Sequence, residues 1–254
     1  MQPHAFTQLK AYLQHQSSRT YNARGSAAKR CEHCLLSEAT CICLWRTPQH
    51  CHIDFILLMH RNEVFKPTNT GKLIADIFPE HTHAFCWSRC EPAPALISLL
   101  ADPTRQCAIA FPPNKDDIAI KRLYHHQQCD LLLMEKTLTI IFLDGTWKQA
   151  SKMMRLSQWL QNVPIITLNV QTNATYSLRK APQAHQLSTA EAASAALSAT
   201  GQTVQAQVLQ DYFSVFNTHY EAMRANRPPS TTAAHERLKA NSNNEQSHYI
   251  NATG

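Results

Sequence analysis

Residues 139–149 of the chain, TIIFLDGTWKQ, place a strand directly before the start of a helix. Residues 139–143 carry no charge, and four of the five are β-branched or aromatic, which is typical of a buried strand. Asp144 and Gly145 then break the pattern before a helical one begins at about Lys148. In an open α/β sheet, ligands bind at the carboxyl ends of strands, where a starting helix offers free backbone N–H groups. Asp144 is therefore either an N-terminal helix cap or a catalytic carboxylate.

Composition sets the broad class of the protein. The 254 residues suffice for one large domain with a small appendage. Lys and Arg outnumber Asp and Glu by 24 to 18, and the net charge of +6 suits a polyanionic partner such as RNA. The sequence has neither a membrane-length apolar run nor a signal peptide at its start, so we expect a cytoplasmic protein without membrane contact. Glycine-rich dinucleotide and triphosphate motifs are absent, and nothing indicates an obligate protein partner.

Four cysteines lie within thirteen residues, as one Cys-x2-Cys pair and one Cys-x-Cys pair: Cys31, Cys34, Cys41 and Cys43. Two such pairs can close a tetrahedral zinc site, because each pair reaches one metal from one turn. His33 could replace one sulfur, but the spacing favours the four cysteines. Unligated apolar cysteines are the alternative, and they fit poorly because this polar segment offers no core. We therefore expect residues 31–50 to form a zinc knuckle with a structural metal.

Strand-like and helix-like segments alternate along the rest of the chain, as in an α/β domain. The expected strands, besides residues 139–143, are 52–59, 81–87, 106–113 and 163–170. The expected helices are 72–78, 94–101, 148–160, about 190–200 and 204–226. Residues 114–137 predict a short helix and a polar connection. Residues 1–30 predict a short helix and a basic linker, and the polar residues 227–254 predict a disordered tail.

Two of these segments have both a structural and a functional interpretation. Ser188 and Glu191 fit the S-x-x-E capping box, which is the structural account of both residues. Thr68 or Asn69 would cap the helix at 72–78. The basic and hydroxyl side chains around them could instead contact nucleic-acid phosphate.

Four sequence blocks, given at the end of this paragraph in chain order, together resemble the DTW-domain family over about residues 30–225. The similarity is to its bacterial zinc-containing branch, the tRNA-uridine aminocarboxypropyltransferases. Arg61 follows His60 at a position where we would expect Pro. The four blocks are Cys31-x2-Cys34-x6-Cys41-x-Cys43, His60-x2-Glu63-x4-Thr68-Asn69-Thr70-Gly71, Asp144-Gly145-Thr146-Trp147, and Leu178-Arg179-Lys180-Ala181-Pro182 leading to Leu187-Ser188-Thr189-Ala190-Glu191-Ala192.

The resemblance implies a fold and a reaction. The fold is an α/β domain over residues 51–226, with a parallel sheet flanked by helices and a SPOUT-like C-terminal trefoil knot. The implied donor is S-adenosylmethionine and the implied partner is tRNA, whose variable-loop uridine becomes 3-(3-amino-3-carboxypropyl)uridine as methylthioadenosine is released. Two alternatives stay open: an S-adenosylmethionine-dependent RNA methyltransferase of the same knotted class, and a zinc-bearing RNA-binding protein without catalysis.

Position and resemblance together assign the site residues. Asp144 is the first candidate to accept the proton of uridine N3, and Glu191 is the second. Trp147 could stack on a ligand or anchor the core, and Arg179 could pair with the donor carboxylate or with RNA phosphate. The residues expected to bind the donor are Phe111, Pro112, Gly145, Thr146, Trp147, Leu178, Arg179, Ser188 and Thr189. The residues expected to border the RNA are Arg30, His60, Arg61, Glu63, Lys66, Thr68, Asn69 and Thr70.

Overall fold

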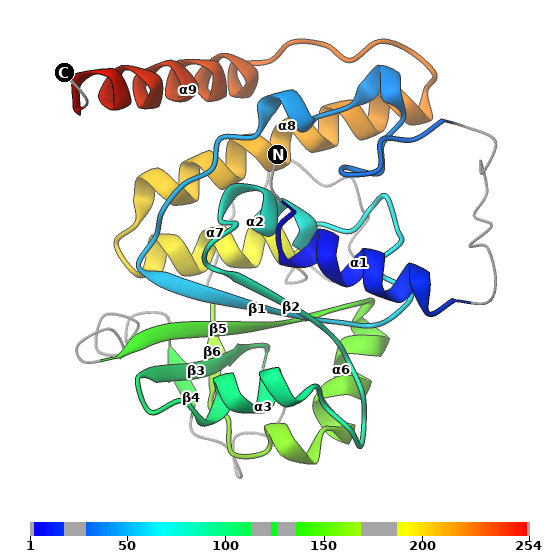
Figure 1. The fold of residues 1–254 in the computed structure, drawn as a ribbon, viewed down its shortest axis with the longest axis vertical. Coiled ribbons are helices and arrows are strands. Elements are labelled where there is room, and N and C mark those ends of the chain that lie inside the picture. Colours follow the sequence, from blue (N-terminus) through cyan, green and yellow to red (C-terminus); the bar gives the residue numbers. More distant parts are fainter. Residues whose placement is uncertain (1–2, 18–28, 113–122, 126–135, 169–186, 253–254) are drawn as a thin grey trace.

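The computed structural model describes residues 3–17, 29–112, 123–125, 136–168 and 187–252, and these form an α/β fold (Figure 1). Within them lies a six-stranded sheet of order β2-β1-β5-β3-β6-β4, in which every paired strand is parallel. The expectation of a parallel sheet is confirmed. The strands are β1 (Ile53–Met59), β2 (Thr82–Cys86), β3 (Arg105–Ala110), β4 (Leu123–His125), β5 (Thr137–Asp144) and β6 (Ile165–Thr167).

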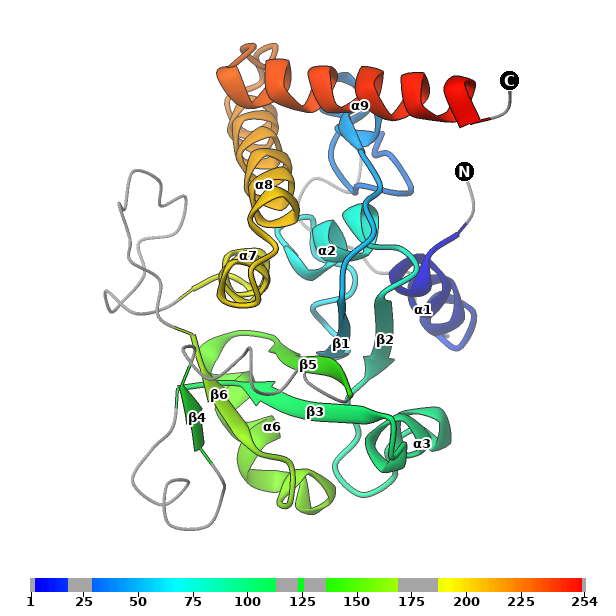
Figure 2. The same ribbon diagram turned by 90° about the vertical axis from the view of Figure 1, so that its left-hand side faces the viewer.

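Helices cover both faces of the sheet. Figures 1 and 2 show α1, α2, α7 and α8 on one face and α3 and α6 on the other, with α9 lying across α8. The helices are α1 (Ala5–His15), α2 (Gly71–Ile77), α3 (Pro94–Ala101), α6 (Trp147–Leu156), α7 (Thr189–Ala199), α8 (Thr203–Arg224) and α9 (Ala233–Ala252).

The two central strands are buried on both sides, which explains their continuous apolar sequence. Every residue of β1 is buried. Successive side chains of a strand point to opposite faces, so Phe55 and Leu57 enter the core under α2, α7 and α8. Ile56 and Leu58 enter the second core, which α3 and α6 cover.

The strand order reverses at β1. From β1 the chain goes to β2 at one edge of the sheet. It then crosses to the other side of β1 to form β3, and β5 later inserts between β1 and β3. In parallel α/β sheets, ligands bind at the carboxyl ends of strands next to such a reversal. Here the ends of β1 and β5 are in register, with Met59 opposite Asp144.

The structure differs from the sequence-based expectation in two places. A short strand, β4, lies inside residues 114–137, where we expected a helix and a connection. Residues 233–252 form α9 instead of belonging to a disordered tail. The docked part of α9 buries Ala234, His235 and Leu238. Composition did not predict this docking, because only a few apolar side chains of α9 take part in it. An ion pair with two hydrogen bonds between Arg237 and Asp211 also holds the helix.

Two further expectations concern the path of the chain and the membrane. The C-terminal knot depends on how residues 169–186 run, and these lie outside the described residues. Among the residues that the structure describes, no helix combines the length and the apolarity needed to cross a bilayer.

Candidate active site and metal centre

Asp144 is the last residue of β5 and lies at the carboxyl edge of the sheet. Its backbone carbonyl accepts a 2.9 Å hydrogen bond from the N–H of His60, the first residue after β1. The residue is 5% exposed. A carboxylate with so little solvent needs hydrogen-bond donors from the protein.

Two side chains from distant segments supply such donors. Asn69 Nδ2 donates to Oδ2 of Asp144 over 2.6 Å, and Thr189 Oγ1 donates to Oδ1 over 3.0 Å. Asn69 precedes α2, and Thr189 is the first residue of α7. The N–H of Ala190 donates to Thr70 Oγ1 over 3.4 Å and joins the two segments directly. Asp144 thus lies between the N-termini of two helices, where the positive ends of their dipoles favour negative charge.

The start of α2 approaches Asp144 so closely that a side chain at Gly71 would force the carboxylate to move. A Cβ atom added at Gly71 would lie 2.5 Å from Oδ2 of Asp144, well inside van der Waals contact. Asn69 is fixed in the same turn, because its Oδ1 accepts a 3.0 Å bond from the N–H of Lys72. The carboxylate is therefore held by packing as well as by hydrogen bonds.

The helix after β5 is capped by Thr146 and not by Asp144. The Thr146 hydroxyl accepts from the Gln149 N–H over 3.3 Å, and the Gln149 side chain accepts from the Thr146 N–H over 2.7 Å. Thr146 is therefore the N-terminal cap of α6. Of the two interpretations of Asp144, the helix cap is thus not the one that the structure shows. The T-x-x-Q pattern is visible in the sequence, but we did not predict a role for Gln149.

Gln149 also connects α6 to β1. Its Nε2 lies 3.1 Å from Nδ1 of His60. Burial lowers the pKa of His60, and the positive charges of Lys152 and Lys66 lower it further, against the opposing charge of Glu63. The imidazole is therefore neutral at pH 7, and it stacks near Trp87 with ring centroids 6.4 Å apart.

Glu191 forms the capping box that its sequence pattern predicts. Its Oε2 accepts from the N–H of Ser188 over 2.8 Å, while the Ser188 hydroxyl accepts from the N–H of Glu191 over 3.3 Å. Glu191 is half-buried at the same end of α7 that presents Thr189 to Asp144. Both candidate carboxylates therefore belong to one region, but the contacts of Glu191 are those of a cap.

The remaining donor-site candidates that the structure describes lie around this edge. The rings of Phe111, which follows β3, and Trp147, which starts α6, have centroids 5.9 Å apart. Trp147 is half-buried and belongs to neither main core cluster of the described residues, whereas Phe111 packs against one of them. Pro112 is exposed beside Phe111. Leu178 and Arg179 fall outside the described residues.

The residues expected to border the RNA divide into surface and buried positions. Asn69 is 2% exposed and bonded to Asp144, and Glu63 is 4% exposed with Oε1 2.5 Å from Lys66 Nζ. Burial argues against direct RNA contact by these two residues. Arg30 closes the cysteine-containing loop by donating to the Leu35 carbonyl over 3.1 Å. Exposed or half-buried side chains remain at His60, Arg61, Lys66, Thr68 and Thr70.

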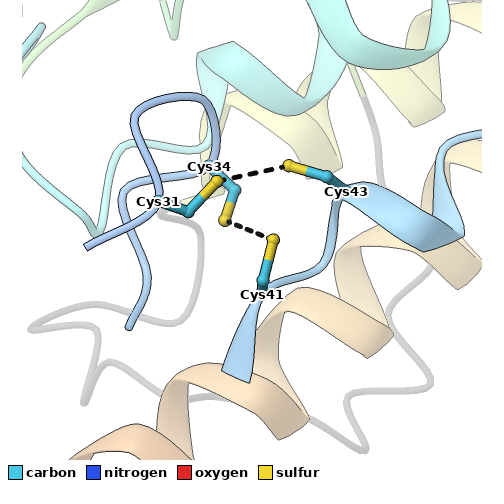
Figure 3. A group of neighbouring side chains, drawn as sticks. All are labelled: Cys31, Cys34, Cys41 and Cys43. Atoms are coloured by element: carbon cyan, nitrogen blue, oxygen red, sulfur yellow. Dashed lines mark hydrogen bonds between the residues drawn. The ribbon is translucent and has the colours of Figure 1, made fainter. Parts of the chain in front are cut away.

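The four knuckle cysteines converge on one point (Figure 3). Their Sγ atoms all lie within 4.8 Å of one another, with 3.6 Å between Cys31 and Cys43 and 3.8 Å between Cys34 and Cys41. Tetrahedral zinc, with Zn–S bonds of about 2.3 Å, separates its sulfurs by about 3.8 Å. His33 is exposed and is not part of this set. The cluster therefore fits a structural zinc ion, and the cysteines alone can complete its coordination.

Electrostatics of the thiols also favour a cation. Hydrogen bonding with Cys43 lowers the pKa of Cys34 to about 4, although burial opposes this shift. The same contact raises the pKa of Cys43, and burial raises the pKa of Cys41 to about 11. The four sulfurs cannot all become thiolates at pH 7 without a positive ion among them.

Comparison with known proteins gives the chain a family. No solved structure of another protein matches it. The DTW domain matches residues 28–221, about three quarters of the chain. This range includes the cysteine cluster, the loop that ends at Gly71, the strand that ends at Asp144 and the start of α7. On this match the chain belongs to the DTW-domain family.

Proposed function

We propose that this protein transfers the 3-amino-3-carboxypropyl group of S-adenosylmethionine to N3 of a uridine in the variable loop of tRNA. The DTW-domain family is a family of tRNA-modifying enzymes. The observation that carries the proposal is the Asp144 carboxylate, held between the starts of α2 and α7 at the carboxyl edge of the sheet. A structural tie between helices does not require a carboxylate with so few water contacts, whereas such carboxylates cluster at functional sites.

Residues around this edge fit a donor that has an adenosine part and an amino-acid part. Bound S-adenosylmethionine supplies a sulfonium whose adjacent carbon is attacked by uridine N3, so that the C–S bond breaks and methylthioadenosine leaves. Phe111 and Trp147 offer aromatic faces for a base. Ser188 and Thr189 begin a helix whose N-terminus suits a carboxylate. We assign Pro112, Gly145, Thr146, Leu178 and Arg179 to the same donor site.

Asp144 is assigned the proton of uridine N3. N3 becomes nucleophilic only when it loses that proton, so an acceptor must lie close to it. The hydrogen bonds from Asn69 and Thr189 orient the Asp144 carboxylate at this edge of the sheet. Glu191, bonded to its own helix, is the less favoured acceptor.

The RNA side of the site is assigned to the surface residues after β1. Arg61 is exposed, and His60, Lys66, Thr68 and Thr70 are half-buried. The N–H of His60 donates to the backbone carbonyl of Asp144, and Thr70 Oγ1 accepts from the N–H of Ala190 beside Thr189. A uridine in folded tRNA must turn outward before its N3 can be reached, so the backbone around it has to be held. The proposal also includes a structural zinc and the knotted C-terminal path that the resemblance implies.

The test is incubation with S-adenosylmethionine and unmodified tRNA, followed by mass analysis of the nucleosides and of the small-molecule product. Methylthioadenosine together with aminocarboxypropyluridine is the expected result. Asp144→Asn should lower the rate about 10²- to 10⁴-fold while keeping the fold and donor binding. An Asp144→Asn protein with full turnover would exclude Asp144 as the proton acceptor.

The two alternative functions give different outcomes in the same assay. S-adenosylhomocysteine with a methylated nucleoside would identify a methyltransferase. Affinity for tRNA without any binding of S-adenosylmethionine would identify an RNA-binding protein.

A further inference from the structure

The exposed face of α6 carries three basic side chains: Lys148, Lys152 and Arg155. Their spacing of four and three residues places them on one side of the helix, over about 10 Å of its axis. The opposite side buries Ala150, Met153 and Met154 against the sheet. The three basic residues, here called the α6 basic face, therefore point away from the core.

The stability of the helix does not explain this arrangement. A positive charge in the first turn, such as Lys148, opposes the helix dipole, and like charges four residues apart repel each other. The helix contains no acidic residue, and residues 145–190 contain five Lys or Arg and no Asp or Glu. Arg155, in the last turn, is favourable to the dipole, but Lys148 and Lys152 are placed at a cost to the helix, which points to a partner outside it.

The α6 basic face lacks the acidic partners that several other cations of the described chain have. Arg46, Lys66, Arg105 and Arg237 each lie within ion-pair distance of a carboxylate. Within the described residues, no member of the α6 basic face forms such a pair. Their charge is therefore available to an anionic partner.

The α6 basic face is continuous with the proposed active site. Helix α6 starts three residues after Asp144, and its Gln149 contacts His60. Lys152 and Lys66 both act on His60, so positive charge extends from Lys66 past His60 to α6. Figures 1 and 2 show α6 on the face of the sheet opposite α8 and α9.

We propose that the α6 basic face binds the sugar–phosphate backbone of the RNA strand next to the target uridine. This inference rests on the proposed function, because it takes RNA as the substrate. Phosphates follow one another along a strand, so a row of Lys and Arg fits them without reading sequence. Holding the neighbouring phosphates would also keep an outward-turned uridine in place.

The test compares two triple variants that each remove three positive charges. Lys148→Gln/Lys152→Gln/Arg155→Gln changes the α6 basic face. Arg224→Gln/Arg227→Gln/Lys239→Gln changes three exposed residues on the side of α8 and α9. Binding of unmodified tRNA is measured by fluorescence anisotropy between about 0.05 and 0.3 M salt. Binding of S-adenosylmethionine, measured by calorimetry, verifies that each variant is folded.

The α6 variant should lose about two units of slope in the plot of log affinity against log salt concentration, and about 10- to 100-fold in affinity near 0.1 M salt. The control variant should keep a slope close to that of the wild type. Equal losses in both variants, or an unchanged slope in the α6 variant, would overturn the inference.

Failure of the proposed function gives a different pattern. A wild-type protein that binds S-adenosylmethionine but has no affinity for tRNA would overturn both proposals. A lower slope in the α6 variant, together with a product other than aminocarboxypropyluridine, would support the RNA-binding face and reject the proposed reaction.

Discussion

The side-chain amide of Asn69 donates a 2.6 Å hydrogen bond to Oδ2 of Asp144, which is 75 residues further along the chain. Both side chains are buried, and Asn69 is itself held by the N–H of Lys72. This pair joins the loop after β1 to the end of β5. Asn69 therefore fixes the orientation of the Asp144 carboxylate, a contact that its place in a basic and hydroxyl-rich loop did not indicate.

Asn69→Ala should lower both stability and turnover. It leaves Oδ2 of Asp144 without this donor and the start of α2 without an acceptor, which costs about 1–3 kcal/mol of unfolding free energy. A carboxylate displaced by about 1 Å can lose about 10²-fold in rate. Urea unfolding and tRNA modification assays measure the two effects. The exposed Asn62→Ala is the matched control, and equal effects of the two substitutions would contradict the positioning role.

Gly71→Ala should be destabilising because of Asp144. The added Cβ would lie 2.5 Å from Oδ2 of that residue, and such overpacking costs about 1–3 kcal/mol. In an Asp144→Ala background the clash is gone, and alanine at a helical position is then neutral or stabilising by up to about 1 kcal/mol. A double-mutant cycle in urea should therefore show strong coupling between these two positions. Additive changes in unfolding free energy would show that the close approach of Gly71 to Asp144 does not affect stability.

One zinc ion should copurify with each chain, and a strong chelator should lower Tm by about 10 °C or more. The knuckle packs on α8, where the Ser37 N–H lies 3.2 Å from the sulfur of Met223, so its loss should disturb more than the loop. Cys41→Ser should reproduce the effect of the chelator. The exposed Cys90→Ser should not, because Cys90 lies outside the cluster. Metal analysis and thermal unfolding give the readouts, and a fully stable metal-free protein would contradict the assignment.

Docking of α9 should weaken as the pH falls. His219 Nδ1 lies 3.0 Å from the Thr40 carbonyl, and its Nε2 lies 3.1 Å from Nε2 of His235. His235 Nδ1 accepts from the N–H of Thr232 over 3.0 Å, so the chain of bonds needs both imidazoles neutral. Burial lowers the pKa of both residues.

The direction of the pH effect follows from these lowered pKa values. Below the ordinary pKa of 6.5 the unfolded chain binds protons that the folded pair excludes, so stability falls with falling pH. The contribution is complete above about pH 6.5 and is lost as the pH approaches the lowered values. Urea unfolding between about pH 5 and 8 should show a shallower pH dependence in His235→Gln. The exposed His52→Gln is the control, and a wild-type profile in His235→Gln would reject the explanation.

Short sequence patterns predicted the features that are determined by residues close together in the chain. The apolar run 139–143 lies in β5, and the S-x-x-E pattern forms the capping box at Ser188 and Glu191. The paired cysteine motifs gather into one cluster because each pair lies within a few residues of chain. The same reasoning missed β4 and α9, since a three-residue strand and a helix docked by few apolar side chains leave little periodic signal.

The sequence by itself determined an α/β chain with a four-cysteine knuckle and a candidate carboxylate at a strand end, because each follows from spacing within a short segment. Only the tertiary structure decided the contacts of that carboxylate. It assigned the cap of α6 to Thr146 and brought Asn69 and Thr189 onto Asp144 from opposite directions along the chain. It also brought Gly71 against the same carboxylate. These contacts arise from the order in which parallel strands pair, and a strand's own residues do not specify which neighbour it takes.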